Sequence, residues 1–359
     1  MESLLNEAIA TGKERGAQVA IYRDGKLLAD AWAGVADVRS GQAVDGDTLF
    51  PVFSATKGMM ATVMHILAER GQVDYDKPVA YYWPEFAAKG KEKITVRHAL
   101  AHTSGLPYMP EGVTYEQLGD WDGMCRLMAQ MEPVHPAGER QLYHAVTYGW
   151  ILGEVARRVD GRAFQPFMEA EICGPLGLTT MFCGLPAELE PRVAFLEITW
   201  EEKVSPPPPN DIAPCMIPLH EWMNRSDARR ACLPASSGIM NARALARHYA
   251  ALLPGGVDGV ELISPKQMAQ ALEEQVPSRG YEKGFTRRGV GYILNRGLSG
   301  TDEKADAFGH PGYGGSFGYA DTRHHVAVGL THNRFSDYPL GDLVEKEIRT
   351  VLGLPEGVS

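Results

Sequence analysis

Apolar and polar residues follow two kinds of pattern along this chain, and the two kinds occupy different regions. After a short helical stretch at the start, residues 17–22 are mostly apolar, Arg23-Asp24-Gly25 is a turn signal, and residues 27–33 resume the apolar stretch. This order predicts a β-hairpin. Near the other end, residues 290–294, 316–319 and 326–331 are typical of strands, and residues 340–352 of a closing helix.

Between these β-rich ends the pattern is mainly helical. Apolar residues cover most of the circumference of residues 54–70, which predicts a buried helix, with Gly71 at its C-terminal end. Helices are also predicted at 146–159, 163–172 and 243–253, and the proline run 205–210 predicts an extended, exposed connection. Strands at both ends around a helical middle predict one sheet built from both termini.

Composition and charge narrow the possible functions. The 35 basic and 45 acidic residues give a net charge of −10, which disfavours binding to nucleic acids. The five cysteines, at 125, 173, 183, 215 and 232, show no metal-binding spacing and are expected to be reduced thiols. We find no secretory signal and no membrane-spanning run, so we expect a cytoplasmic protein without contact to a membrane.

The first candidate site is Ser54-Ala55-Thr56-Lys57, at the start of the predicted buried helix. A spacing of three residues places the hydroxyl and the ammonium group on one helix face. Burial lowers the pKa of a lysine, which can then take the serine proton, and the helix N-terminus offers N–H groups to an oxyanion. Taken alone, the same residues also fit a helix cap with a solvated lysine.

Two further segments carry candidate chemistry. Tyr143 follows a Pro/Gly turn and precedes an apolar helix, where a phenol near a lysine can shuttle protons; a buried core tyrosine shows the same pattern. The run Phe308-Gly309-His310-Pro311-Gly312-Tyr313-Gly314-Gly315 is rich in glycine, which lets a ligand approach the main chain. A plain β-turn is the alternative there.

Taken in order, the three segments resemble the serine β-lactamase and penicillin-binding-protein-like superfamily. Ser54-Ala55-Thr56-Lys57 matches its Ser-x-x-Lys motif, Tyr143 matches the first residue of its Tyr-x-Asn motif, and His310-Pro311-Gly312 stands in place of its Lys-Thr-Gly. Further matching stretches extend the resemblance over residues 5–353: Thr48-Leu49-Phe50, His102-Thr103-Ser104-Gly105-Leu106, Pro175-Leu176-Gly177-Leu178, Gly238-Ile239-Met240 and Gly289-Val290-Gly291-Tyr292.

The resemblance implies a fold and a reaction. The fold is α+β: an antiparallel sheet from residues 1–81 and 281–359 lies beside a mainly helical domain, residues 82–280, with the active site in the groove between them. The reaction is acyl transfer through an acyl-enzyme on Ser54, without a metal or a cofactor, and Lys57 and Tyr143 manage the proton. The oxyanion would lie between the main-chain N–H groups of Ser54 and Tyr313.

His310 and Gly312 would contact the substrate, but the second and third motifs depart from the family pattern. Ala145 replaces the asparagine, and His310 and Pro311 replace lysine and threonine. A neutral imidazole offers one donor where an ammonium offers three and a charge, so a β-lactam carboxylate would be poorly held.

These departures favour a class C-like carboxylesterase (family VIII) that acts on a small-molecule ester, lactone or amide. Sequence does not separate this enzyme from an acyltransferase of the same fold that uses an acceptor other than water. A β-lactamase or peptidoglycan peptidase fits the motifs less well. A catalytically silent binding module is the alternative outside the enzymes, and the intact Ser54, Lys57 and Tyr143 argue against it.

Two other patterns imitate functional motifs. Gly314-Gly315-Ser316-Phe317-Gly318 fits the Gly-x-Ser-x-Gly elbow of α/β-hydrolases, but a β-like stretch follows where that motif needs a helix. His98 and His102 have the spacing of a metal pair without a third ligand nearby. We interpret both patterns as structural.

Overall fold

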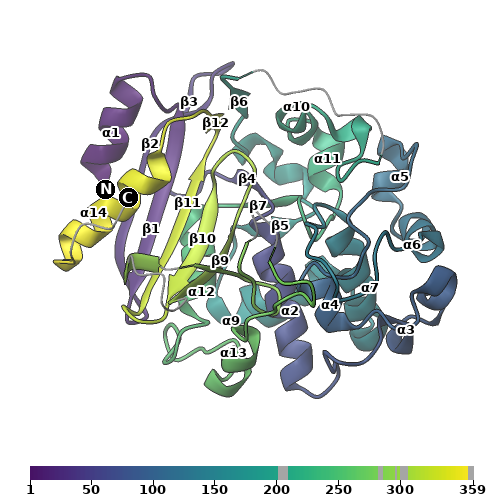
Figure 1. Cartoon of the computed structure of the whole chain (residues 1–359). Coiled ribbons are helices and arrows are strands. Elements are labelled where there is room, and N and C mark those ends of the chain that lie inside the picture. Colours follow the sequence, from purple (N-terminus) through teal and green to yellow (C-terminus); the bar gives the residue numbers. More distant parts are fainter. Residues whose placement is uncertain (201–208, 282–285, 296, 300–305, 355–359) are drawn as a thin grey trace.

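A seven-stranded antiparallel sheet joins the two ends of the chain (Figure 1). This computed structural model describes residues 1–200, 209–281, 286–295, 297–299 and 306–354. The strand order is β3-β2-β1-β11-β10-β9-β8, so strands from the start and the end of the chain meet in the middle of the sheet. The strands are Gly16–Arg23 (β1), Lys26–Asp37 (β2), Gln42–Ala43 (β3), Ile293–Asn295 (β8), Ala307–Pro311 (β9), Phe317–Asp321 (β10) and Val326–His332 (β11).

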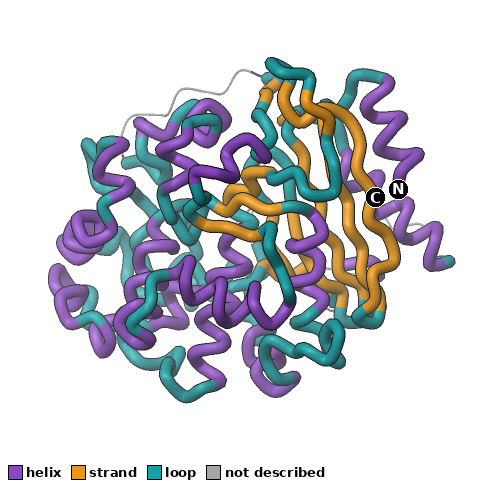
Figure 2. Tube along the Cα trace, turned by 180° about the vertical axis from the view of Figure 1, so that it is seen from behind, coloured by secondary structure: helices purple, strands orange, loops and turns teal. Residues whose placement is uncertain are grey.

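The central strands of this sheet are buried on both faces, because side chains of alternating residues enter two different cores. On one face, Val19, Ile21, Val328 and Leu330 pack with the terminal helices α1 (Glu2–Ala10) and α14 (Leu340–Leu352). On the other face, Ala20 and its neighbours face helix α12 (Ala242–Ala250) and join the core of the helical part. Figure 2 shows from behind how the sheet separates the terminal helices from the helical part of the molecule.

A second, three-stranded sheet lies within the helical part and carries the first candidate motif. Its order is β4-β7-β5, with β4 at Phe50–Phe53, β5 at Met181–Cys183 and β7 at Gly238–Met240. The short strands β6 (Glu197–Ile198) and β12 (Arg334–Phe335) pair separately. The remaining α-helices are Thr56–Glu69 (α2), Val79–Tyr82 (α3), Val96–Leu100 (α4), Tyr115–Gly119 (α5), Trp121–Gln130 (α6), Thr147–Asp160 (α7), Phe164–Met168 (α8), Gly174–Leu176 (α9), Leu219–Met223 (α10), Ser226–Arg230 (α11) and Pro265–Ala271 (α13).

The predicted mixture of helices and an antiparallel sheet is confirmed, and most predicted elements are present. The hairpin turns at Asp24 and Gly25, and residues 56–67 of α2 are all buried, as the apolar circumference predicted. Helix α14 has the predicted bounds, and none of the helices in the described ranges is long and apolar enough to cross a membrane.

Three predicted elements differ in the structure. The helix expected at 163–172 continues to Leu176, because a wider helical turn at Glu169–Cys173 joins α8 to α9. The strand expected at 290–294 begins only at Ile293, because Gly291 adopts a φ of 97° in a tight turn before it. The extended connection predicted at 205–210 falls largely on residues 201–208, which lie outside the described residues.

Candidate active site

Ser54 lies between strand β4 and helix α2, where the chain turns sharply. The preceding residue, Phe53, has a φ of 45°, a left-handed conformation that is strained for an aromatic residue. Helix α2 begins at Thr56 rather than at the predicted Ser54, so the serine stands just ahead of the helix. The Thr56 hydroxyl donates to the Phe53 carbonyl and accepts the Gly238 N–H at 2.9 Å, which fixes this turn to β7.

Lys57 is completely buried, and three oxygen atoms surround its Nζ. Nζ lies 3.1 Å from Ser54 Oγ, 2.7 Å from the Ala145 carbonyl and 2.9 Å from the Ala235 carbonyl. Burial first, and the charge of Arg288 second, hold the pKa of Lys57 well below its ordinary value. The solvated-lysine alternative from the sequence is therefore wrong.

These three contacts match the bonding capacity of a neutral amine. An uncharged amino group has two N–H donors and one lone pair, and the two main-chain carbonyls can only accept. In the neutral form, which the lowered pKa of Lys57 favours, the two donors go to Ala145 and Ala235 and leave the lone pair for the hydroxyl of Ser54. In this state Lys57 is oriented to take the proton of Ser54.

Tyr143 brings a phenol to the same serine. Its side chain forms a hydrogen bond with Ser54, and its ring centre lies 4.9 Å from Lys57 Nζ. Burial raises the pKa of Tyr143 to about 12, although the bond to Ser54 and the charge of Arg288 act in the opposite direction. The structure thus brings Ser54, Lys57 and Tyr143 together, although they lie up to 89 positions apart in the sequence.

His310 lies against Tyr143 at the end of β9, with ring centres 6.1 Å apart. Burial first, and then the charges of Lys57 and Arg288, hold its pKa well below the ordinary value, so the imidazole is neutral. Its Nδ1 lies 2.7 Å from the Pro311 carbonyl, which can only accept, so Nδ1 carries the proton. The remaining nitrogen, Nε2, is therefore an acceptor, and the donor expected from the sequence is already used within the chain.

Gly312 allows the segment His310-Pro311-Gly312 to pack closely against strand β4. A Cβ atom at this position would lie 2.0 Å from the Val52 carbonyl oxygen, so only glycine fits. Its N–H donates to the Ser316 carbonyl at 2.7 Å. The next residue, Tyr313, packs edge-on against Phe53, with ring centres 5.7 Å apart. The main chain of residue 313 is thereby held beside the turn that carries Ser54.

Replacing Gly312 by alanine is expected to lower both activity and stability. The added methyl group must push β9 away from β4, because the atom it meets belongs to the main chain. We expect a loss of about 1–3 kcal/mol in the free energy of unfolding, measured by urea denaturation, and a fall in kcat. Gly119→Ala is the control, because nothing lies within 4 Å of a Cβ there. An equal effect of both changes would contradict this account of Gly312.

A cavity of about 400 Å³ opens at these residues. Ser54, Tyr143, His310 and Gly312 line it. Its remaining wall is mainly apolar and includes Phe53, Val146, Ile212, Met216, Leu219, Ile293 and Tyr313. Such a wall suits an uncharged acyl or alkyl group.

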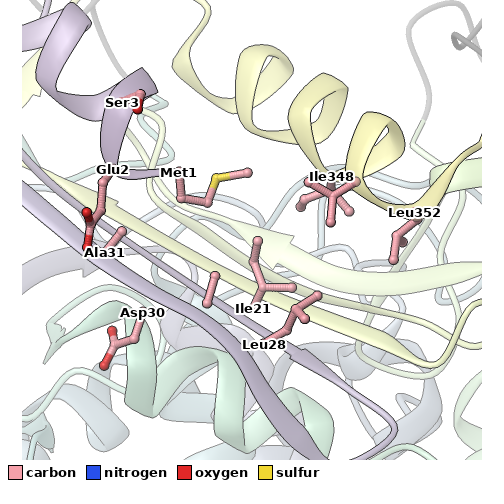
Figure 3. Close-up of a pocket in the computed structure, with 11 residues that line it drawn as sticks. Met1, Glu2, Ser3, Ile21, Leu28, Asp30, Ala31, Ile348 and Leu352 are labelled. Atoms are coloured by element: carbon pink, nitrogen blue, oxygen red, sulfur yellow. The ribbon is translucent and has the colours of Figure 1, made fainter.

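A second cavity, of about 490 Å³, lies on the outer face of the large sheet (Figure 3). Figure 3 shows Met1, just ahead of helix α1, and Ile348 and Leu352 of helix α14 above Ile21 and Leu28 of the strands. None of the candidate site residues lines this cavity, so its size does not make it the active site.

Arg288 is a site residue that the sequence interpretation missed. It lines the cavity with only 5% of its surface exposed, and its guanidinium carbon lies 5.2 Å from the Tyr143 ring centre. It directly precedes the matching stretch 289–292, but Arg287 stands beside it, and the pattern does not show which arginine points inward. In the structure, Arg287 pairs with Glu274 at 2.6 Å instead.

The two imitating patterns have structural explanations. Ser316 is buried and accepts the His332 N–H at 3.3 Å, and strand β10 follows it where an elbow would need a helix. His98 accepts the Thr95 N–H as part of a helix cap, and His102 accepts the His144 N–H at 3.0 Å. Within the described ranges, no group of three or more metal-ligating side chains occurs.

Comparisons with known proteins agree with this fold and extend over nearly the whole chain. The family model described as Beta-lactamase matches residues 1–351. "Esterase/beta-lactamase LipL" of Mycobacterium tuberculosis is 33% identical over 349 residues, which cover 89% of this chain and 77% of that protein. "Esterase EstB" of Burkholderia gladioli is 31% identical over 209 residues, or 54% of this chain and 53% of that protein.

Solved structures show the same relationship. A family VIII carboxylesterase superposes with a TM-score of 0.84 at 34% identity, covering 96% of this chain and 94% of that chain. A penicillin-binding protein homologue from Caulobacter crescentus superposes with a TM-score of 0.80 at 33% identity, covering 93% and 90%. Since the family model spans 351 of the 359 residues, this chain belongs to the Beta-lactamase family.

Proposed function

We propose that this protein is a serine hydrolase that cleaves carboxylic esters or lactones through an acyl-enzyme on Ser54. The observation that carries the proposal is the environment of Lys57: a buried amine that donates to two main-chain carbonyls and whose Nζ lies 3.1 Å from Ser54 Oγ. This arrangement activates a nucleophile that is unreactive on its own. Family membership and the esterase relatives support the same reaction class.

In the acylation half of the reaction, Ser54 Oγ forms a bond to the ester carbonyl carbon while its proton passes to Lys57 Nζ. The carbonyl oxygen becomes an oxyanion, for which the main-chain N–H groups of Ser54 and Tyr313 are the proposed donors. The bond to the alcohol then breaks, and the departing oxygen takes the proton of the Tyr143 phenol. The proton held by Lys57 then passes to the Tyr143 oxygen. Ser54 now carries the acyl group, and the Lys57 and Tyr143 side chains are both neutral.

In the deacylation half, water replaces the alcohol. Its oxygen attacks the acyl carbon, and its proton passes to the Lys57–Tyr143 pair. The bond to Ser54 Oγ breaks as that oxygen regains a proton, and the carboxylic acid leaves. An acyltransferase would place a second alcohol where the water enters, so product analysis in the presence of an added alcohol separates the two reactions.

The substrate preference follows from the charges around the cavity. The buried His310 imidazole is neutral, and its one N–H donor is used within the chain, so it offers neither a charge nor a donor to a carboxylate. The apolar wall suits an uncharged ester. We therefore propose neutral short or medium esters as the substrate class, ahead of β-lactams.

We expect kcat/KM for p-nitrophenyl esters of short or medium acyl length to exceed that for nitrocefin by at least about tenfold, or about 1.4 kcal/mol. The test is a steady-state comparison of both substrates with the purified protein. His310→Lys should narrow the ratio if the missing charge is the cause. Hydrolysis of nitrocefin at or above the esterase rate by the unchanged protein would defeat the assignment.

A further inference from the structure

The guanidinium of Arg288 is a buried charge for which the described part of the chain provides no counterion. Within the described residues, its Nε and Nη1 have no hydrogen-bond partner, and no carboxylate forms an ion pair with it. Its neighbours include the rings of Tyr143 and Tyr148. An unpaired charge in such a place destabilises the fold, and a charge kept at that cost in the wall of a reaction site indicates a role in the chemistry.

The geometry argues against direct binding of a substrate anion by Arg288. Arginine recognises a carboxylate best through two parallel N–H donors, but Nε and Nη1 of Arg288 are both closed off from solvent. The cavity also carries an exposed carboxylate, Asp211, which opposes the entry of anions. The charge of Arg288 therefore acts across space, on groups that are already in place.

Five tyrosines and histidines around it are uncharged at neutral pH. Burial raises the pKa of Tyr148 and brings that of Tyr143 to about 12. Burial lowers the pKa of His144 to about 3 and holds those of His102 and His310 well below the ordinary value. Among these described neighbours, Arg288 is thus the fixed charge that Lys57 experiences.

We propose that Arg288 is a positioning residue for acyl transfer: its charge beside the Tyr143 ring adds to the effect of burial in keeping Lys57 neutral, so that the amine can accept the Ser54 proton. This inference rests on the proposed roles of Ser54 and Lys57. It also assigns to Arg288 the positive charge that the third motif lacks, since His310 is neutral.

The size of the effect follows from the distances. The guanidinium carbon and Lys57 Nζ lie 5.2 and 4.9 Å from the centre of the same Tyr143 ring, so the two cations would be at most about 10 Å apart. At an effective dielectric constant of about 20, repulsion over that distance shifts a pKa by about one unit. The rate of Ser54 attack rises with pH as Lys57 loses its proton, so removing Arg288 moves this rise to higher pH.

The test measures the rate at which a fluorophosphonate probe labels Ser54 as a function of pH. In this reaction the Ser54 oxygen bonds to phosphorus, fluoride leaves and the proton goes to Lys57, so no knowledge of the natural substrate is needed. We expect Arg288→Gln to shift the rising limb of this pH–rate curve to higher pH by about one unit. At pH values below the limb, the variant should be labelled about tenfold more slowly than the unchanged protein. Arg288→Lys, which keeps the charge, should restore the original position.

Arg287→Gln is the matched control, because that neighbouring arginine pairs with Glu274 and should leave the limb unchanged. If Arg288→Gln does not fold, Arg288→Met removes the same charge. Slower labelling by the same factor at every pH, or a limb moved equally by Arg288→Lys, would overturn the proposal and leave a structural role. Normal labelling without ester hydrolysis would instead count against the proposed function, so the two failures are distinguishable.

Discussion

Replacing Ser54 by alanine is expected to reduce ester hydrolysis by at least about 10³-fold while the fold is retained. Covalent catalysis needs the oxygen that lies 3.1 Å from Lys57 Nζ, and alanine removes it. The loss is measured as kcat for a p-nitrophenyl ester, with circular dichroism and thermal unfolding to confirm that the protein is folded.

Ser316→Ala is the matched control for this change. Ser316 is equally a serine of a motif-like sequence, but it is buried and accepts a main-chain N–H. Its replacement should cost about 1 kcal/mol of stability and leave kcat nearly unchanged. Activity that survives in Ser54→Ala and disappears in Ser316→Ala would reverse the assignment of the nucleophile.

Lys57→Ala and Tyr143→Phe should each lower kcat by about 10²- to 10⁴-fold, and their effects should not multiply in the double variant. Both side chains contact the Ser54 hydroxyl, and in the proposed mechanism they share one proton, so losing either one would interrupt the same relay. A double-mutant cycle on kcat, normalised to the amount of folded protein, measures this coupling.

The two single variants should differ in stability. Lys57→Ala leaves the buried carbonyls of Ala145 and Ala235 without a donor, at a cost of about 1–3 kcal/mol each, whereas Tyr143→Phe keeps the ring. Urea unfolding therefore provides a readout that is independent of catalysis. A double variant whose loss equals the product of the single losses would exclude a coupled relay, and normal rates in Tyr143→Phe would exclude the phenol from the mechanism.

Local patterns were sufficient to predict the elements whose burial is periodic. The helix at 340–352 lies on one face of the large sheet, so polar and apolar positions mark its two sides directly. The hairpin at 17–33 was indicated instead by its turn signal between two apolar stretches, because its first strand is buried almost throughout. The start of β8 was wrong by three residues because Gly291 turns the chain there, and an apolar stretch does not show a turn that depends on packing.

In the candidate site, the sequence could predict side chains that belong to recognisable motifs, but not the main-chain groups that contact them. Ser54, Lys57 and Tyr143 occur in motifs, and the structure brings them into contact. The carbonyls of Ala145 and Ala235 could not be predicted, because every residue has a carbonyl group and only the fold decides which ones meet Lys57. Arg288 was missed because the direction of a side chain depends on the turn before β8.

The main-chain contacts of Lys57 determine which neighbouring side chain can be exchanged without disturbing it. Its two carbonyl partners belong to the backbone, so exchanging the side chain of Ala145 does not remove the carbonyl that contacts Lys57. The side chain that is asparagine in the family motif can therefore change without loss of this contact, and it also forms part of the cavity wall. Position 145 is accordingly a suitable target for saturation mutagenesis that aims to change the substrate range without removing the carbonyl that contacts Lys57.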